Sequence, residues 1–236
     1  MKYILVDIDG TVTSLESNPY QPIDGISYDY FRGILRDMLA KKLNCNHSLA
    51  LNMIQEKAAV FNGCNFRVAP LLGIPEQALW EEVLAWQCKH LSVFDDAVDM
   101  VKNLFAEGFN LYAVSNNSCK GIQAKLSHAG LADITGSPYF KKLYGMDLFG
   151  LGWSKSMPEV YSIILQKERF SPEEVVMVGD EPAIDLESPL KGGMKHAVIV
   201  DRMQKEEVAF KNNGLFVRSL RIIPEILRGA WSLHLT

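Results

Sequence analysis

The sequence predicts an α/β protein: a doubly wound parallel sheet with a Rossmann-like core, into which an all-helical cap domain is inserted. Two observations favour this fold class. Short apolar runs rich in β-branched residues alternate with stretches of helical periodicity, as in sheets whose strands are buried on both faces. About 100 residues separate the first run from the second, although a crossover needs only about 10–12, so the interval contains an insertion.

The predicted core strands are five short apolar runs. A polar residue comes at or just after the end of four of these runs, which places polar side chains at the carboxyl edge of the sheet. Apolar residues three or four apart predict core helices over residues 97–107, 120–128 and 157–168. The capping-box spacing of Ser156 and Glu159 predicts the start of the last helix. The strands are expected at residues 3–6, 111–114, 175–178, 197–200 and 215–217.

The insertion is predicted to be a cap built of helices. Its apolar residues recur three or four apart with little strand signal, as amphipathic helices require. Breaks fall at Asn62-Gly63 and at residues 73–75, where Gly and Pro interrupt the pattern. We therefore expect a cap of about four helices. The predicted division of the chain is a cap over residues 18–91 and a core made of residues 1–17 and 92–236.

Composition excludes several classes of partner. With 24 basic and 28 acidic side chains the net charge is −4, so nucleic acid and anionic membranes are not generally attracted. The N-terminal apolar run is shorter than a signal-peptide core of roughly 7–15 residues, and nowhere do about 18 apolar residues run together as in a membrane span. The four cysteines lack zinc-binding spacing, which favours free thiols in a reducing cytosol. We expect a soluble cytoplasmic protein, and the sequence does not indicate an oligomeric state.

A short motif with two carboxylates that could take part in catalysis begins where the first predicted strand ends. Asp7 lies at the carboxyl end of that strand, where open α/β sheets place their ligands. Asp9 can return to the same side two residues later, and Gly10 permits a sharp turn. An Asp-Gly turn after a strand is also common without any function. A string Asp-x-Asp-Gly-Thr arises by chance in only about one chain in several hundred of this length, so it favours a functional site.

Three more groups of polar residues lie where the same crevice needs them. Ser115 follows the second strand, and Asn116 comes directly after it. Lys155 precedes the third core helix, and Asp180 and Asp185 follow the third strand. Each alone has an ordinary explanation: a helix cap, a solvated lysine, or a turn at a strand end. Together, however, these residues follow the strands and precede the helix whose ends meet at one edge of the sheet. This joint arrangement indicates a single site.

In these motifs the chain resembles the haloacid dehalogenase superfamily. The signature of that family is Asp-x-Asp-Gly-Thr, then Ser or Thr, then Lys, then Gly-Asp with a further Asp downstream, and the resemblance spans residues 1–201. The insertion between the first two motifs is similar to that of the phosphoglycolate phosphatase-like and β-phosphoglucomutase-like subgroup. The resemblance implies a magnesium-dependent phosphatase that hydrolyses a small phosphorylated metabolite through an aspartyl-phosphate.

The resemblance also implies a role for each catalytic residue. Asp7 would be the nucleophile and Asp9 the general acid and base. Ser115 and Lys155 would hold the equatorial oxygens of the phosphoryl group. Substrate specificity would come from the cap and the strand ends. Candidate contacts to the rest of the substrate are Asn116, Arg67 and the region around Tyr20.

A magnesium ion is expected from charge as well as from the resemblance. Up to four carboxylates would surround a phosphate dianion, and Lys155 would offset only one of these negative charges. Oxygen-only ligands suit Mg²⁺, which keeps several waters and takes one or two carboxylates with substrate phosphate. By the resemblance, the ligands would be the Asp7 carboxylate, the Asp9 backbone carbonyl and Asp180, with Asp185 in support.

Several alternatives share part of this pattern. A dehalogenase of the same fold would work without metal and would not use an acid at Asp9, and a phosphomutase would share every core motif. A phosphonatase would need an extra cap lysine, for which Lys41, Lys42 and Lys57 are surface candidates. A phosphorylatable receiver module lacks a large insertion after its first strand. A catalytically silent scaffold would not need the retained motif residues.

Overall fold

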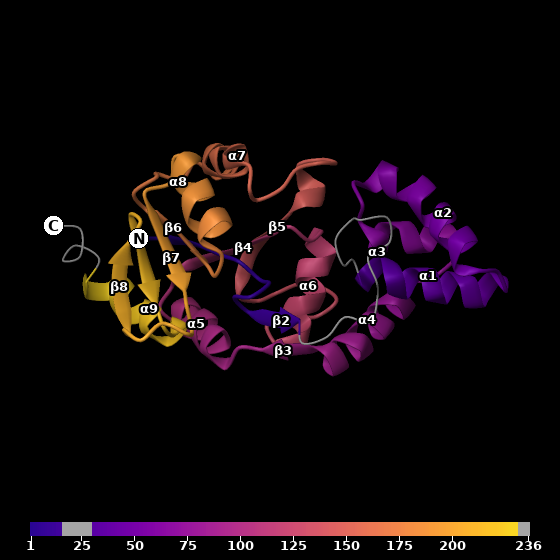
Figure 1. Cartoon of the computed structure of the whole chain (residues 1–236), viewed down its shortest axis with the longest axis horizontal. Helices are drawn as coiled ribbons and strands as arrows, with labels where there is room; N and C mark the ends of the chain where they lie inside the picture. The colour runs from indigo at the N-terminus through magenta and orange to yellow at the C-terminus, as the bar shows by residue number, and fades with distance from the viewer. Residues whose placement is uncertain (16–29, 231–236) are drawn as a thin grey trace.

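The computed structural model describes residues 1–15 and 30–230, and its centre is a seven-stranded sheet (Figure 1). The strand order is β5-β4-β1-β6-β7-β9-β8, and every neighbouring pair is parallel except β8 with β9. This arrangement confirms the doubly wound α/β class. The strands are β1 Tyr3–Val6, β4 Asn110–Ser115, β5 Phe140–Gly145, β6 Val175–Gly179, β7 His196–Val200, β8 Val208–Lys211 and β9 Gly214–Val217.

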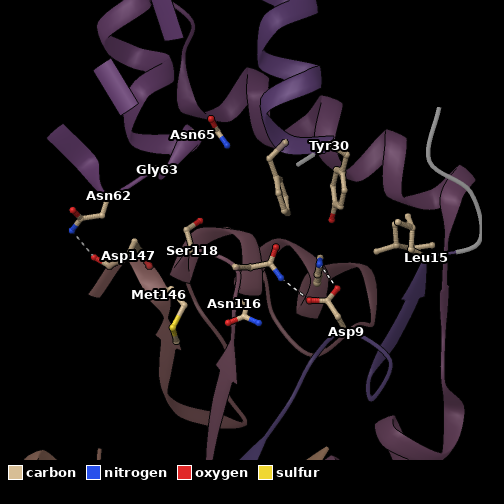
Figure 2. Close-up of a pocket in the computed structure, with 14 residues that line it drawn as sticks. Asp9, Leu15, Tyr30, Asn62, Gly63, Asn65, Asn116, Ser118, Met146 and Asp147 are labelled. Atoms are coloured by element: carbon tan, nitrogen blue, oxygen red, sulfur yellow. Dashed lines mark hydrogen bonds and ion pairs between the residues drawn. The ribbon is translucent and has the colours of Figure 1, made fainter. Parts of the chain in front are cut away.

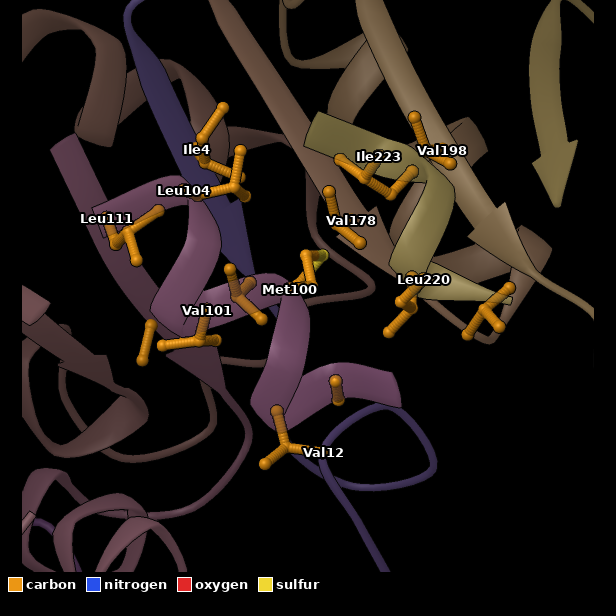
Figure 3. Close-up of a cluster of buried hydrophobic side chains, with 14 of the residues drawn as sticks. Ile4, Val12, Met100, Val101, Leu104, Leu111, Val178, Val198, Leu220 and Ile223 are labelled. Atoms are coloured by element: carbon orange, nitrogen blue, oxygen red, sulfur yellow. The ribbon is translucent and has the colours of Figure 1, made fainter. Parts of the chain in front are cut away.

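Helices cover both faces of the sheet because alternate residues of each strand point to opposite sides. In β1, Ile4 and Val6 pack with α5 on one face, as Figure 3 shows for Ile4, while Leu5 packs with α7 on the other. The core helices are α5 Asp95–Ala106, α6 Cys119–His128, α7 Pro158–Glu168, α8 Ser188–Lys191 and α9 Ile223–Glu225.

All five predicted strands form, and β5 and β8 are additional strands. Both lie at the edges of the sheet, where one side of the strand faces solvent. In β5 the exposed Lys141 and Lys142 interrupt the apolar run that would have identified it. The prediction of a capping box at Ser156 was wrong. Met157 is the N-cap of α7 without a side-chain hydrogen bond, and the Ser156 hydroxyl donates to Ser154 Oγ at 3.1 Å.

The described part of the inserted segment, from residue 30 onward, folds into four α-helices and two short 3₁₀ turns at one end of the sheet, beside α6 (Figure 1). Asn62, Gly63 and Gly73 have left-handed backbone and separate the helices, as the sequence predicts. Strand β2 Thr13–Leu15 precedes the inserted helices in sequence and pairs antiparallel with β3 Leu91–Val93, which follows them. The helices are α1 Tyr30–Leu43, α2 His47–Ala58, α3 Asn65–Val68 and α4 Glu76–His90.

The inserted helices have a hydrophobic core of their own. It is built around aromatic side chains such as Phe31, Phe66 and Trp80, and it includes Ala124 from α6. The core helix α6 therefore packs against the insertion as well as against the sheet. The exact division at residues 18 and 91 stays a prediction. Within residues 1–15 and 30–230, every helix is too short or too polar to cross a bilayer.

Candidate active site

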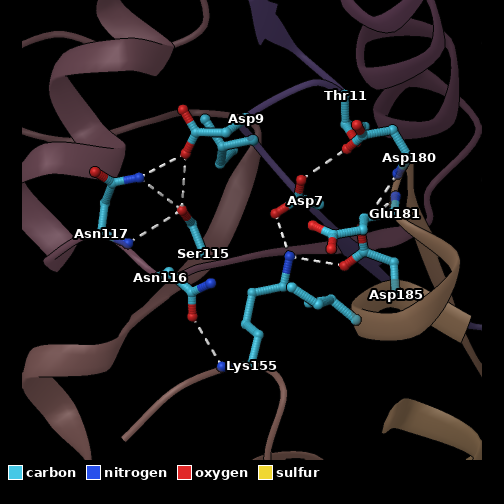
Figure 4. A network of polar contacts seen from close by, with 12 residues as sticks. Asp7, Asp9, Thr11, Ser115, Asn116, Asn117, Lys155, Asp180, Glu181 and Asp185 are labelled. Atoms are coloured by element: carbon cyan, nitrogen blue, oxygen red, sulfur yellow. Dashed lines mark hydrogen bonds and ion pairs between the residues drawn. The ribbon is translucent and has the colours of Figure 1, made fainter. Parts of the chain in front are cut away.

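The motif residues converge at the carboxyl edge of the sheet (Figure 4). β1 lies between β4 and β6, so the residues that follow these three strands become neighbours. Asp7 follows β1, Ser115 ends β4, and Asp180 follows β6. Asp185 lies in a π-helical turn, Pro182–Glu187, a local geometry that is frequent at functional sites.

Three carboxylates form one cluster on the β1–β6 side of the site. One oxygen from each of Asp7, Asp180 and Asp185 lies within 4.8 Å of the others. The Thr11 hydroxyl lies 3.3 Å from Asp7 Oδ2 and 3.1 Å from Asp180 Oδ1, so it bridges two of the acids. Asp185 Oδ2 accepts the backbone N–H groups of Asp180 at 3.2 Å and Glu181 at 3.1 Å. These bonds fix the cluster from the backbone of the loop.

Lys155 supplies the positive charge beside this cluster. Its side chain is buried, its ammonium forms an ion pair with Asp7, and it lies 2.7 Å from Asp185 Oδ1. Burial alone would lower the pKa of Lys155, but Asp7 and Asp185 raise it above its ordinary value. Asn116 orients the lysine, because its Oδ1 accepts the Lys155 backbone N–H at 2.8 Å.

The carboxylate cluster remains short of positive charge. Burial raises the pKa of Asp7 well above its ordinary value; Lys155 opposes this shift, and Asp185 and Asp9 add to it. Burial and Asp185 also raise the pKa of Asp180. Three carboxylates with oxygen donors only, held around one ammonium, fit a hard divalent cation such as Mg²⁺.

Asp9 lies outside this carboxylate cluster but in the same crevice, beside Ser115. Its Oδ2 accepts the Asn117 amide at 2.6 Å and the Ser115 hydroxyl at 3.3 Å (Figure 4). Its Oδ1 pairs with Lys125. Desolvation raises the pKa of the Asp9 carboxyl, but Lys125, Lys155 and the Ser115 hydrogen bond together hold the pKa below its ordinary value. The site therefore has two parts, one around Asp7 and one around Asp9.

Asp9 lines a cavity of about 400 Å³ between the core and the inserted helices (Figure 2). The β4–α6 loop contributes Asn116, Asn117 and Ser118, and Ser118 is also the N-cap of α6. The insertion contributes apolar and amide side chains to the opposite wall. Those residues are Tyr30, Phe31, Asn62 and Asn65.

The predicted substrate contacts are placed differently by the structure. Asn116 lines the cavity, whereas Arg67 is exposed and does not, although Asn62 and Asn65 from the same break do. Tyr20 lies outside the described residues. The cap lysines considered for a phosphonatase are on the surface of α1 and α2: Lys41, Lys42 and Lys57.

Sequence reasoning missed Lys125, a buried lysine that contacts Asp9. A signal was present in the helical pattern. Lys125 lies three residues after Ile122 and directly before Leu126, both fully buried, so it occupies the apolar arc of α6. A lysine on the buried arc of a helix needs a partner, and this one is paired with Asp9.

Comparisons with known proteins identify sequences similar to this chain. A family model for haloacid dehalogenase-like hydrolases matches residues 1–193. The enolase-phosphatase E1 of Methylococcus capsulatus is 24% identical over 212 residues, covering 85% of this chain and 89% of the relative.

Solved structures share the fold over nearly the whole chain. A HAD phosphatase from Thermococcus onnurineus has a TM-score of 0.57 at 24% identity, covering 97% of this chain and 99% of that one. An L-2-haloacid dehalogenase from Xanthobacter autotrophicus has a TM-score of 0.55 at 17% identity, covering 98% and 99%. Together with the family match over most of its length, these results show that the chain belongs to the haloacid dehalogenase-like hydrolase family.

Proposed function

We propose that this hydrolase is a Mg²⁺-dependent phosphatase that acts on a small phosphorylated metabolite through an aspartyl-phosphate on Asp7. The observation that carries the proposal is the division of the site. A carboxylate cluster with a buried lysine surrounds Asp7, while Asp9 faces a separate cavity. That arrangement suits a phosphoryl group on one side and its leaving group on the other. The phosphatase names of the relatives support the same activity.

Mg²⁺ would be held by the Asp7 and Asp180 carboxylates and the Asp9 backbone carbonyl, with Asp185 in support. When bound, the ion would offset the negative charge of the carboxylates and of the substrate phosphate. Asp185 has a second task in this arrangement, because it accepts two backbone N–H groups of the Asp180 loop and pairs with Lys155. It would therefore orient both Asp180 and Lys155.

The residues divide the reaction into two steps. In the first, an Asp7 oxygen forms a bond to phosphorus while the bond between phosphorus and the leaving oxygen breaks. Lys155 and Ser115 hold the phosphoryl oxygens. Asp9 gives a proton to the leaving oxygen, which requires its protonated form at this step, although Lys125 favours the ionised form that the second step uses. In the second, Asp9 takes a proton from water, the water oxygen bonds to phosphorus, and inorganic phosphate leaves Asp7.

Asp9 also favours a phosphatase over a dehalogenase of the same fold. Its carboxylate lines the cavity on the leaving-group side, where an alkoxide needs a proton and a halide does not. A phosphomutase is the second candidate, because it would use the same residues and return the phosphoryl group to its product. Release of inorganic phosphate in proportion to substrate consumed separates the two. The cytoplasmic location stays a prediction.

The experiment compares leaving groups in the wild type and in Asp9→Asn at saturating Mg²⁺. General acid catalysis is worth typically 10²–10⁴-fold and less where the leaving oxygen is already a stable anion. We expect Asp9→Asn to depress kcat for an alkyl phosphate far more than for p-nitrophenyl phosphate. A uniform loss across leaving groups would deny Asp9 the role of acid.

Two further variants isolate the nucleophile. Asp7→Asn should abolish phosphate release while keeping the fold, because it removes the nucleophile and preserves its shape. Asp99→Asn is the matched control: this carboxylate lies on α5 and pairs with Arg221 at the surface, away from the site. Substantial turnover by Asp7→Asn, or undiminished wild-type turnover after chelation, would contradict the proposal.

A further inference from the structure

The Asp9 carboxylate is held at both of its oxygens. Oδ2 accepts the Asn117 amide at 2.6 Å and the Ser115 hydroxyl at 3.3 Å, and Oδ1 pairs with Lys125. The Asp9 side chain lines the cavity and is 49% exposed, so packing alone does not select its rotamer. The hydrogen-bond donors therefore decide where this carboxylate points. Among residues 1–15 and 30–230, Lys125 is the donor that reaches Oδ1.

The donors to Oδ2 come from a single loop and cannot fix the carboxylate by themselves. Ser115 ends β4, and Asn117 two residues later also donates its amide to Ser115 Oγ at 2.9 Å. Both bonds to Asp9 end on the same oxygen, so the carboxylate could still turn about that oxygen. The contact between Lys125 and Oδ1 comes from another direction, because Lys125 lies on α6, and it prevents this rotation.

Lys125 is itself firmly held. Its side chain is only 5% exposed. Two aromatic rings of the insertion enclose the ammonium, with the Tyr30 and Phe31 centroids 5.6 and 5.9 Å from Nζ. Burying an ammonium is costly unless an anion compensates for the lost water, so the lysine stays paired with Asp9.

The insertion fixes the two rings that enclose the lysine. Gln87 of α4 donates its amide to the Tyr30 hydroxyl at 2.9 Å. Phe31 packs closely on α6, because a Cβ atom on Gly121 would lie 3.2 Å from the Phe31 ring. Gly121 is four residues before Lys125 and shares its face of the helix. The position of Lys125 is therefore set by the insertion and α6 together.

We propose that Lys125 is a positioning residue for Asp9, and that the insertion takes part in the reaction through it. This inference rests on the phosphatase activity proposed above, in which Asp9 moves a proton in both steps. Lys125 acts on the orientation of the Asp9 carboxylate, so its loss is expected in kcat and not in KM. A misplacement of a reacting group by about 1 Å can cost about 10²-fold in rate.

The test measures kcat and KM for 2-hydroxyethyl phosphate at saturating Mg²⁺. Lys125→Met should lower kcat by about 10- to 100-fold and leave KM within about 3-fold of the wild type. Lys125→Arg keeps the charge and the N–H donors and should regain part of the lost rate. Lys120→Met is the matched control and should have wild-type kinetics. Lys120 is on the same helix and pairs with Glu76 of the insertion at 2.9 Å, but it does not line the cavity.

A double-mutant cycle with Asp9→Asn separates positioning from support of the fold. In the Asp9→Asn background, Lys125→Met should change kcat by less than about 3-fold, because no acid is left to orient. Similar losses in both backgrounds would overturn the positioning role, and so would a raised KM at unchanged kcat. Should Lys125→Met fail to fold, Lys125→Arg gives the same cycle with a smaller loss, because its larger head group shifts the carboxylate.

The wild type tests the underlying activity separately. Mg²⁺-dependent hydrolysis of p-nitrophenyl phosphate, combined with an effect of Lys125 that does not depend on Asp9, would overturn this inference and leave the phosphatase standing. Absence of hydrolysis of every phosphate ester by the wild type would overturn both proposals.

Discussion

Two glycines allow the carboxylate cluster to pack directly against the backbone. A Cβ atom on Gly10 would lie 2.1 Å from Asp180 Oδ2, and one on Gly179 would lie 2.2 Å from Asp185 Cγ. Gly10 also has a φ of +82°, which costs a side-chain-bearing residue about 1–2 kcal/mol. Gly10→Ala should therefore displace Asp180 and raise the Mg²⁺ concentration for half-maximal activity by about 10-fold or more, equivalent to about 1.4 kcal/mol. Titrating Mg²⁺ against p-nitrophenyl phosphate hydrolysis measures this change.

Gly108→Ala separates crowding from backbone strain. Gly108 has a φ of +83°, nearly that of Gly10, and a Cβ there meets nothing within 4 Å. Both variants should lose similar stability from backbone strain, but Gly108→Ala should keep the Mg²⁺ dependence of the wild type. A normal Mg²⁺ requirement in Gly10→Ala would show that the close approach of Asp180 is not needed for metal binding.

At the scale of elements, Arg202 ties the loop after β7 to the loop that carries the catalytic aspartates. Its Nη1 donates to the Gly10 carbonyl at 2.9 Å and its Nη2 to the Thr11 carbonyl at 3.0 Å. Asp96 of α5 holds the same guanidinium at 2.9 Å, and the guanidinium stacks on the Phe94 ring. One side chain thus links α5, the catalytic loop and the carboxyl end of β7, and it fixes the loop from outside the site.

Arg202→Gln should destabilise the protein by about 2–4 kcal/mol, because it leaves Asp96 and two carbonyls without a charged partner. In the folded variant we expect kcat to fall about 10-fold, equivalent to about 1.4 kcal/mol, with little change in KM, since the loop carries the nucleophile. Denaturant melts and steady-state kinetics measure the two effects. Arg221→Gln removes an exposed pair with Asp99 and should leave stability nearly unchanged. Similar small effects from both arginines would contradict the positioning role.

At the scale of the whole molecule, the proposed Mg²⁺ ligands connect distant parts of the chain. Asp7 and Asp180 follow adjacent strands of the sheet, although 172 residues separate their positions in the sequence. A ligand that binds the folded chain alone adds stability, by about 2.7 kcal/mol at 100 times its Kd. For a domain of this size that corresponds to a rise in Tm of about 5–10 °C.

We therefore expect Mg²⁺ to raise the wild-type Tm and to have little effect on Asp180→Asn. Asp99→Asn, which alters an exposed carboxylate of α5, should respond like the wild type. Calorimetry with and without Mg²⁺ at fixed ionic strength measures the shift. An equal shift in wild type and Asp180→Asn would place the ion elsewhere on the molecule.

Local patterns in the sequence were enough to predict the fold class, the five apolar strands and the residues at their carboxyl ends. Each buried strand is one uninterrupted apolar run, and a parallel sheet brings the ends of such runs to one edge. For that reason Asp7, Ser115 and Asp180 could be assigned to one site before any contact was known. The edge strand β5 escaped detection because its exposed lysines broke the apolar pattern.

Only the tertiary structure decided which side chains meet inside the site. Lys125 pairs with Asp9 across 116 residues of sequence, and Arg202 reaches Gly10 across 192. No local periodicity encodes such pairs, because they depend on how α6 and the loop after β7 pack against the sheet. Packing also turned Asp9 toward the cavity and left Arg67 on the surface. The sequence alone thus determined the chemistry available at the sheet edge, and the packing of helices over that edge determined how its charges are arranged.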